Sequence, residues 1–356
     1  MSDILLWIMA GFAVLGALDR IFGNRFGLGK EFEDGIAAMG SLALAMLGII
    51  CLAPVLAGLL RPVVVPVFRL LGADPAMFAG SILACDMGGG ALAMEMTDDP
   101  QAALFGGVLC GSMLGATVVF TIPVAMGILK EADRPFLAKG ILAGVVTIPL
   151  GLFVGGLISG MPVLKILGNL VPIVLIAGLI ALGLWKREAA MIKGFGIFGK
   201  GIIALITVGL AAGVFEGITG IKLIPGLAPI EDGFLTVGAI AIVLAGAFPL
   251  VLVLTKVLRK PLLKLGIILG INETAAAGLI ASLANSIATF GLVKDMDERG
   301  KVVNIAFAVS AAFVFGDHMG FTAGFAPQML PAMIVSKLVG GISAVAVALW
   351  LTKEKM

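Results

Sequence analysis

The sequence predicts an all-α polytopic membrane protein with ten to twelve transmembrane segments, and three observations support this fold class. Of its 356 residues, 60% are hydrophobic and only 13% are charged, whereas soluble domains carry about 25% charged residues. Apolar runs of the length that a helix needs to cross a bilayer recur along the whole chain. The 50 glycines are about twice the usual ~7%, which is typical of closely packed membrane helices.

Eleven apolar runs are separated by short polar loops, and we interpret residues 1–356 as a single membrane transport domain. The runs are 3–19, 36–60, 76–96, 101–129, 137–160, 163–185, 197–216, 234–256, 270–293, 302–327 and 329–351. Some are long or interrupted by glycine, so one or two are candidates for re-entrant pairs or broken helices. The first run has no basic segment ahead of it, so we expect a retained first span in a bacterial cytoplasmic (inner) membrane.

The distribution of lysine and arginine among the loops gives a first indication of topology. If all eleven runs cross the membrane, the richest loops fall on one side: 61–75, 130–139, 186–200 and 256–264. This interpretation puts the N-terminus in the cytoplasm and the C-terminus outside. Loops 19–34 and 294–301, with three basic residues each, argue against it.

The chain also appears to contain an internal two-fold repeat. The copies are residues 35–160 and 233–351, which a shift of 198 residues aligns without a gap from residue 35 to residue 153, and residues 163–216 are then the connecting spans. The aligned pairs include Gly35 and Gly233, Gly48 and Gly246, Arg61 and Arg259, Gly80 and Gly278, and Lys139 and Lys337. Six spans between the copies would make them parallel, whereas one undetected half-span would invert one of them. Such repeats are common in secondary transporters, which bind their solute at the repeat interface.

The segment LACDMGGGALAMEM, residues 83–96, places an acidic side chain inside an apolar run. A carboxylate at the centre of a membrane helix costs about 2.5–3.5 kcal/mol on insertion scales. Gly88, Gly89 and Gly90 follow Asp86, and each weakens a helix by about 1 kcal/mol relative to alanine. A glycine-broken helix with a buried anion is typical of transporter sites, so we predict Asp86 to bind the solute.

A second polar cluster lies in FVFGDHMGF, residues 313–321. Asp317 and the only histidine, His318, stand between Gly316 and Gly320, which predict another helix break. Both side chains need partners at membrane depth. Two interpretations stay open: a part of the binding site, or a polar clamp between two helices. The histidine could also carry a proton, because its ordinary pKa is near neutral pH.

Further buried polar candidates are Asn285, Asn304 and Ser310. One more residue of shift in the repeat places Asn285 opposite Asp86, and Ser310 precedes Asp317 by about two helical turns. No soluble-enzyme motif or P-loop is present, and one histidine excludes a multi-histidine metal site. We therefore expect no catalytic residue, no cofactor, no metal and no nucleic-acid partner.

In several motifs the chain resembles the ethanolamine permease (EutH) family of ethanolamine utilisation. The motifs are FEDGIAAMGSLALAM (32–46), ADPAMFAG (73–80), LACDMGG (83–89), LAGVVTIP (142–149), IPGLAPI (224–230), MDERGKVVN (296–304) and AFAVSAAFVFGDHMGF (306–321). One departure is SIATF (286–290), where the family has an asparagine–isoleucine–proline run after Asn285. The resemblance implies uptake of ethanolamine across the cytoplasmic membrane by a protein embedded in the lipid bilayer, and no enzymatic activity.

The residues and the resemblance together give a site hypothesis for ethanolammonium, a small monovalent cation. Asp86 would supply the charge, Asn285 a neutral partner, and Asp317 a second acid or proton acceptor. The alternatives are a cation-coupled symporter of another small solute, such as an amino acid or nucleoside, and an intramembrane enzyme or scaffold that uses Asp317 and His318. Glycines 107, 111 and 115 form one helix face, and such faces also permit a homodimer.

Overall fold

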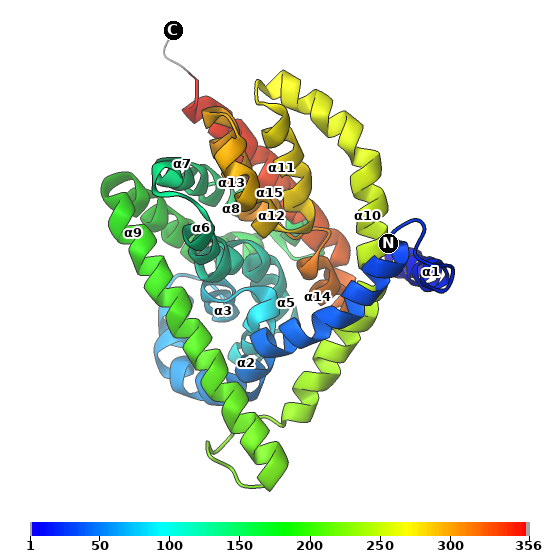
Figure 1. Ribbon diagram of the computed structural model, residues 1–356. Coiled ribbons are helices and arrows are strands. Elements are labelled where there is room, and N and C mark those ends of the chain that lie inside the picture. Colours follow the sequence, from blue (N-terminus) through cyan, green and yellow to red (C-terminus); the bar gives the residue numbers. More distant parts are fainter. Residues whose placement is uncertain (1, 354–356) are drawn as a thin grey trace.

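The computed structural model describes residues 2–353, and every regular element in that range is helical (Figure 1). In chain order the elements are α1 (Ser2–Ile21), α2 (Leu28–Leu70), α3 (Ala76–Ile82), η1 (Cys85–Met87), α4 (Gly89–Met96), α5 (Pro100–Leu104), η2 (Phe105–Gly115), η3 (Thr117–Thr121), α6 (Ile122–Ile128), η4 (Glu131–Asp133), α7 (Arg134–Val145), α8 (Ile148–Ile158), α9 (Val163–Thr219), α10 (Ile230–Leu269), α11 (Glu273–Ala284), α12 (Ser286–Leu292), η5 (Val293–Asp295), α13 (Glu298–Ala311), α14 (Asp317–Phe325), η6 (Pro327–Met329) and α15 (Leu330–Leu351).

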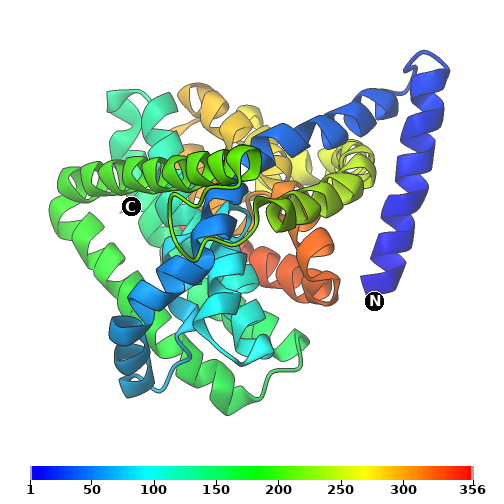
Figure 2. The same ribbon diagram turned by 90° about the horizontal axis from the view of Figure 1, so that it is seen from below.

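Seven helical segments of the described chain are long and apolar enough to cross a membrane. They are 2–21, 28–70, 100–128, 131–158, 163–219, 230–261 and 327–351. α9, of 57 residues, consists of two helices that meet at a kink at Arg187, where φ is −145° and ψ is 56°. Figure 2 shows the resulting two arms, and α1 at the edge of the molecule. The predicted all-α polytopic class is therefore confirmed.

Residues 76–96, here called hairpin 1, enter the protein and return to the face from which they came. The hairpin consists of α3, η1 and α4. Just before α3, the Asp74 carboxylate accepts a hydrogen bond of 2.8 Å from the Thr97 hydroxyl, just after α4. Because its two ends touch, this apolar run does not cross the membrane.

Residues 273–292, here called hairpin 2, are built in the same way from α11 and α12. Asn272 precedes α11, and its side-chain amide donates a 3.0 Å hydrogen bond to the Asp295 carbonyl oxygen. Its backbone N–H donates to the Asp297 carboxylate at 2.8 Å. Both ends of hairpin 2 therefore also lie together at one face.

The two hairpins enter from opposite faces, which we call the hairpin-1 face and the hairpin-2 face. The helical path 100–128 starts beside hairpin 1 and runs 29 residues, roughly 40 Å. Just beyond its far end, Asp133 forms an ion pair of 2.6 Å with Lys301, close to the end of hairpin 2. The C-terminal end of α15 lies at the hairpin-2 face too, where Arg299 donates to the Thr352 carbonyl oxygen at 3.5 Å.

This arrangement corrects the predicted topology. Hairpin 1 does not cross, so loops 61–75 and 130–139 lie at opposite faces. At the hairpin-2 face, Lys256 donates to the Phe26 carbonyl oxygen at 3.2 Å, which places loop 19–34 beside α10. That face thus collects the basic loops 19–34, 130–139, 186–200, 256–264 and 294–301, whereas the other has Arg61, Arg69, Lys165 and Lys222.

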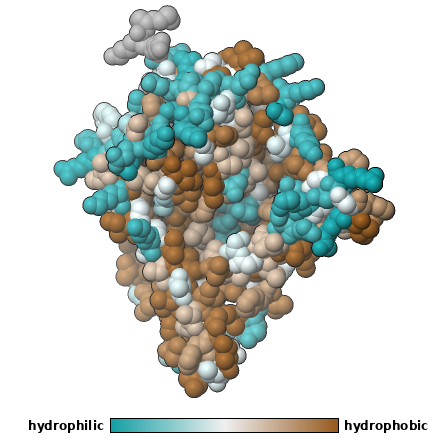
Figure 3. Space-filling model, viewed as in Figure 1, coloured by the Kyte–Doolittle hydropathy of each residue, from teal (hydrophilic) through white to brown (hydrophobic). Residues whose placement is uncertain are grey.

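From the positive-inside rule we infer that the hairpin-2 face is cytoplasmic. The C-terminal end of α15 then lies on the cytoplasmic side, the reverse of the prediction from eleven crossings. Figure 3 shows hydrophilic side chains at the upper end of the molecule and in a second group at its right side, with apolar side chains dominating below them. The error arose because hydropathy does not distinguish a crossing helix from a re-entrant hairpin.

The glycine face of residues 107, 111 and 115 packs against hairpin 1. A Cβ added at these positions would collide with Gly90 and Ala93, with Cys85, and with the Leu83 carbonyl oxygen, in that order. This contact confirms the predicted use of the glycines in helix packing, within the chain. It also carries the tip of hairpin 1 into the protein interior.

The order of elements occurs twice along the chain. A long helix (α2), hairpin 1 and the paths 100–128 and 131–158 come first; α10, hairpin 2 and the paths 298–325 and 327–351 follow. α9 spans the predicted connecting segment 163–216. The repeat boundaries at 35–160 and 233–351 stay a prediction, but the opposed hairpins would make such copies inverted rather than parallel.

Candidate functional site

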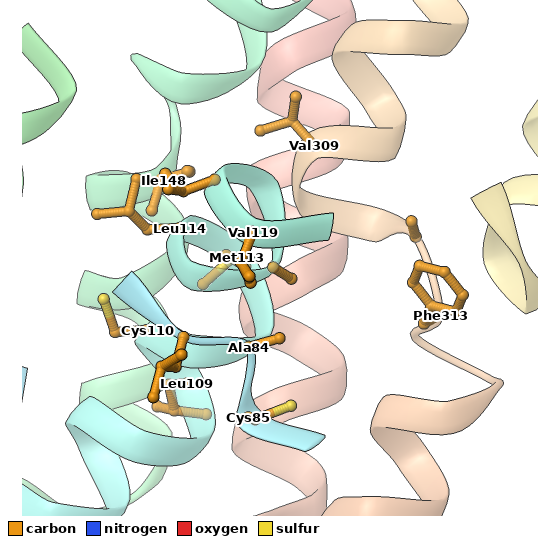
Figure 4. Packing of buried hydrophobic residues seen from close by; sticks show 14 of the residues in the cluster. Ala84, Cys85, Leu109, Cys110, Met113, Leu114, Val119, Ile148, Val309 and Phe313 are labelled. Atoms are coloured by element: carbon orange, nitrogen blue, oxygen red, sulfur yellow. The ribbon is translucent and has the colours of Figure 1, made fainter. Parts of the chain in front are cut away.

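The tip of hairpin 1 is an extended segment followed by a tight turn. α3 ends at Ile82, Leu83 is extended at φ −126° and ψ 141°, and Cys85–Met87 form one 3₁₀ turn. Gly88 then adopts φ 87°, which costs little only for glycine, and a Cβ there would collide with Ile49 of α2. Figure 4 shows Ala84 and Cys85 in this segment, beside the buried side chains of η2. Asp86 therefore stands at the tip of the hairpin, as the broken-helix prediction requires.

A second break separates α13 from α14 at residues 312–316. Phe313 has φ 62°, a conformation that costs a non-glycine residue about 1–3 kcal/mol and that clusters at functional sites. The N–H groups of Phe313 and Phe315 donate to the Ser282 and Leu283 carbonyl oxygens at 3.0 and 2.9 Å. Hairpin 2 is thus bonded directly to the break. Asp317 is the first residue of α14.

A cavity of about 190 Å³ lies between these two breaks. It is lined by Ser41, Leu42, Ala45, Ala84, Asp86, Met87, Ala116, Phe120, Phe313, Asp317 and His318. Its volume is below the ~300–1,000 Å³ of pockets for drug-sized ligands. A solute of a few non-hydrogen atoms therefore fits it best.

The cavity is acidic and has no fixed cation at contact distance. Among the described residues, no lysine or arginine nitrogen lies within 4.0 Å of the carboxylate of Asp86 or Asp317. The Asp86 side chain is 17% exposed, and its Oδ1 is 3.8 Å from His318 Nε2. Asp317 is the first residue of α14, at the positive end of the dipole of that helix. The cavity is accordingly suited to a small cation.

An aromatic wall completes the cavity. The ring of Phe313 lies 5.1 Å from the ring of His318 and 5.6 Å, edge to face, from that of Phe120. Aromatic faces attract cations within about 6 Å of the ring centre. A protonated amine between the carboxylates would therefore also meet an aromatic surface.

Three potential metal ligands also meet at the tip of hairpin 1. A ligand atom of each of Cys85, Asp86 and His318 lies within 4.8 Å of the others. Thiolate, carboxylate and imidazole together suit a borderline-soft divalent ion such as zinc. No metal is predicted from the sequence, because one histidine excludes a multi-histidine site, and this group contains only that one histidine.

Three of the predicted site residues lie outside the cavity lining. Asn285 stands at the tip of hairpin 2, where its Oδ1 accepts a 2.7 Å hydrogen bond from the Ile287 N–H and caps α12. Asn304 donates to the Ala275 carbonyl oxygen at 2.9 Å and so ties α13 to α11. Ser310 is buried with no partner for its hydroxyl among the described residues. Their roles in binding stay predictions.

The structure also refines the predicted glycine breaks. Gly88 and Gly316 lie at the breaks, whereas Gly89 and Gly90 form the first turn of α4. Gly320 is inside α14, so the expectation of a break there was wrong. Its missing side chain instead admits Leu244 of α10.

Sequence reasoning missed the buried lysine of the site region. Lys337 of α15 is 1% exposed, and its Nζ donates a 2.5 Å hydrogen bond to the Ser112 carbonyl oxygen. It was noticed only as the repeat counterpart of Lys139. The sequence feature that could have identified it is a charged residue inside the apolar run 329–351.

Long apolar helices, two opposed hairpins and a small acidic cavity between them define a multi-pass helical membrane protein of the transport class. The family model described as "Ethanolamine utilisation protein, EutH" matches residues 1–351. The chain belongs to this family, and it is a multi-pass protein of the bacterial inner membrane.

Curated relatives match the chain over nearly all of its length. A probable ethanolamine permease EutH of Listeria monocytogenes is 59% identical over 355 residues, covering 100% of this chain and 95% of the relative. The probable ethanolamine permease EutH of Salmonella typhimurium is 48% identical over 391 residues, covering 99% and 96%. An uncharacterised Bacillus subtilis protein, YxeR, is 51% identical and covers 99% and 95%. No solved structure matches the chain.

Proposed function

We propose that this protein takes up ethanolamine across the cytoplasmic membrane as a secondary transporter or facilitator that binds the protonated amine in the central cavity. The observation that carries the proposal is the pair Asp86 and Asp317, two carboxylates without a lysine or arginine at contact distance in a cavity of about 190 Å³. Relatives that are named probable ethanolamine permeases support the choice of solute.

The chemistry of the solute fits the lining residues. Its ammonium group donates three hydrogen bonds, and two carboxylates accept them with charge assistance. Ser41 lines the cavity, and its hydroxyl, which donates to the Ala38 carbonyl oxygen at 2.9 Å, is a candidate acceptor for the solute hydroxyl. An anionic solute would meet like charges in a low-dielectric site and is therefore excluded.

The opposed hairpins provide a route for alternating access. Hairpin 1 would separate the cavity from the outside and hairpin 2 from the cytoplasm. We infer that residues 35–160 and 233–351 act as inverted copies, each contributing one gate to the shared site. Movement of one copy against the other would then expose the same carboxylates to each side in turn.

Counterflow of labelled ethanolamine into proteoliposomes, with and without a pH gradient, tests the proposal. Exchange that needs no gradient is expected from a facilitator, whereas a dependence on the gradient would identify proton coupling. Asp86→Asn should reduce counterflow to background. Asp98→Asn is the matched control, because that carboxylate is fully exposed. Absence of counterflow by the wild-type protein would overturn the proposal.

The cavity volume argues against the larger solutes among the alternatives. A nucleoside has many more non-hydrogen atoms than a cavity of about 190 Å³ accommodates comfortably. In thermal-shift measurements with amines, amino acids and nucleosides at equal concentrations, small amines should raise the melting temperature most. Homodimerisation stays a prediction: the glycine face of residues 107, 111 and 115 that prompted it is occupied by hairpin 1 within the chain.

A further inference from the structure

Lys337 is a buried cation that the proposed binding of ethanolamine does not use. It lies in the middle of α15, is 1% exposed and forms no ion pair among the described residues. Its one hydrogen-bond partner is the Ser112 carbonyl oxygen in η2, an 11-residue π-helix. A charged group in the membrane interior is costly unless it interacts with an opposite charge or serves a function.

The packing places this lysine behind the tip of hairpin 1. Gly111, next to Ser112, is so close to the backbone of Cys85 that a Cβ would come within 3.0 Å of its nitrogen. Cys85 in turn precedes Asp86. Lys337 and Asp86 therefore lie on opposite sides of this packed layer, and Asp86 and Asp317 both line the cavity. The lysine is therefore outside the cavity lining but within its electrostatic field.

We propose that Lys337 is a positioning residue that sets the net charge of the cavity, and so selects solutes carrying one positive charge. Two carboxylates and one lysine leave a net charge of −1 when the imidazole of His318 is neutral. One ammonium group neutralises that charge, whereas a dication would leave a buried excess positive charge. This proposal rests on the proposed function, because it assumes that the solute binds between Asp86 and Asp317.

The test compares two ligands of equal length and different charge. At neutral pH, 3-aminopropan-1-ol is a monocation and 1,3-diaminopropane is a dication. The wild-type protein, purified in detergent, should bind the monocation more tightly. In Lys337→Met the cavity has a net charge of −2, and the affinity ratio should shift towards the diamine by about tenfold, because loss of the lysine charge removes twice as much Coulomb repulsion from the dication as from the monocation.

Two further variants separate this electrostatic role from a structural one. Lys139→Met removes the repeat counterpart of Lys337, which is exposed on α7, and should leave the ratio unchanged. Lys337→Met combined with Asp317→Asn restores a net charge of −1 but also removes one of the two carboxylates proposed to bind the ammonium, so this double variant should bind both ligands more weakly and shift the ratio back towards the monocation. If Lys337→Met alone does not fold, the double variant should fold, because the net charge of its cavity region is again −1, as in the wild type.

An unchanged ligand ratio in Lys337→Met, with amine binding intact, would overturn the proposal and leave the proposed function standing. So would a double variant that fails to fold or keeps the diamine preference, since packing alone would then explain the lysine. Failure of the wild-type protein to bind any amine would instead refute the proposed function.

Discussion

At the scale of single residues, the cavity combines groups that the sequence marks very differently. Asp86, Asp317 and His318 are conspicuous because they are polar residues in apolar runs, and the structure brings all three to one cavity. Phe313 gives no such signal, since its unusual backbone conformation depends on the tertiary hydrogen bond to Ser282. The role of an aromatic residue in an apolar run therefore becomes visible only in the folded structure.

Phe313 should contribute to amine affinity through its ring. Phe313→Ala removes the aromatic wall, and a cation–π contact is worth about 0.5–2 kcal/mol, so ethanolamine affinity should fall about 2- to 30-fold. Isothermal titration calorimetry measures the change. Phe315→Ala is the control from the same break, because that ring does not line the cavity. Equal losses in both variants would contradict a specific contact.

Asp99, just before the membrane-spanning segment 100–128, should make stability depend on pH. Burial alone would raise the pKa of this carboxyl, but hydrogen bonds from Lys165 and from the N–H groups of Ala102 and Gln101 lower it overall. A lowered folded-state pKa stabilises the protein above the unfolded pKa of about 3.9, and that stability is lost as pH falls through the folded value.

Asp99→Asn keeps the helix cap and removes the charge, so it isolates the ion pair with Lys165. The side chain is 39% exposed, and solvent screening limits the loss at neutral pH to about 1 kcal/mol or less. Asp99→Ala should lose about 1 kcal/mol more, because the cap is lost as well. Thermal unfolding in detergent at pH 7 and well below the unfolded pKa of about 3.9 checks both, and a difference between the wild type and Asp99→Asn that persists at the low pH would refute the ionic cause.

At the scale of elements, the sequence predicted the helix breaks better than the path of the chain. The glycines after Asp86 correctly indicated an interruption in run 76–96. The return of this run to its own face depends on contacts with distant residues, chiefly Asp74 with Thr97 and with the Asn169 side chain. Hydropathy contains no information on such contacts, and this is why the topology had to be corrected.

Gly88 should be difficult to replace, because both its backbone conformation and its surroundings disfavour a side chain. In Gly88→Ala, the left-handed conformation costs about 1–2 kcal/mol, and the new methyl group collides with Ile49. We expect a lower melting temperature and weaker amine binding, because the turn that positions Asp86 is displaced. Gly58→Ala in α2 meets no atom within 4 Å and should stabilise its helix by up to about 1 kcal/mol.

Those two glycine variants are best compared by thermal shift with and without ethanolamine. A Gly88→Ala protein that melts and binds like the wild type would show that the turn tolerates a side chain. Ile49→Ala added to Gly88→Ala should recover part of the loss, since it removes the collision but not the strained dihedral angle.

At the scale of the whole molecule, composition alone established the class of protein, and the folded arrangement was needed for its orientation. With two hairpins that do not cross, nearly every basic loop falls on the hairpin-2 face. The same positive-inside rule that gave conflicting indications for eleven crossings thus gives a consistent answer for the observed path.

Cysteine labelling in intact cells can test this orientation. Asp98→Cys lies at the hairpin-1 face and Lys294→Cys at the hairpin-2 face, and both positions are exposed. A membrane-impermeant maleimide should label the first variant in intact cells and the second only after permeabilisation. The native cysteines Cys51, Cys85 and Cys110 are buried and should remain unlabelled. The opposite labelling pattern would reverse the assignment.

The direct contacts of each hairpin with the segment that follows it along the chain bear on how the protein is assembled during synthesis. Hairpin 1 packs on residues 107–115, and hairpin 2 is bonded to residues 313–315. Each polar tip would face hydrocarbon with unsatisfied backbone groups if it entered the bilayer before its receiving helix existed. Both hairpins should consequently remain at the membrane surface until the ribosome has synthesised the next span. They should then insert from opposite sides of the membrane.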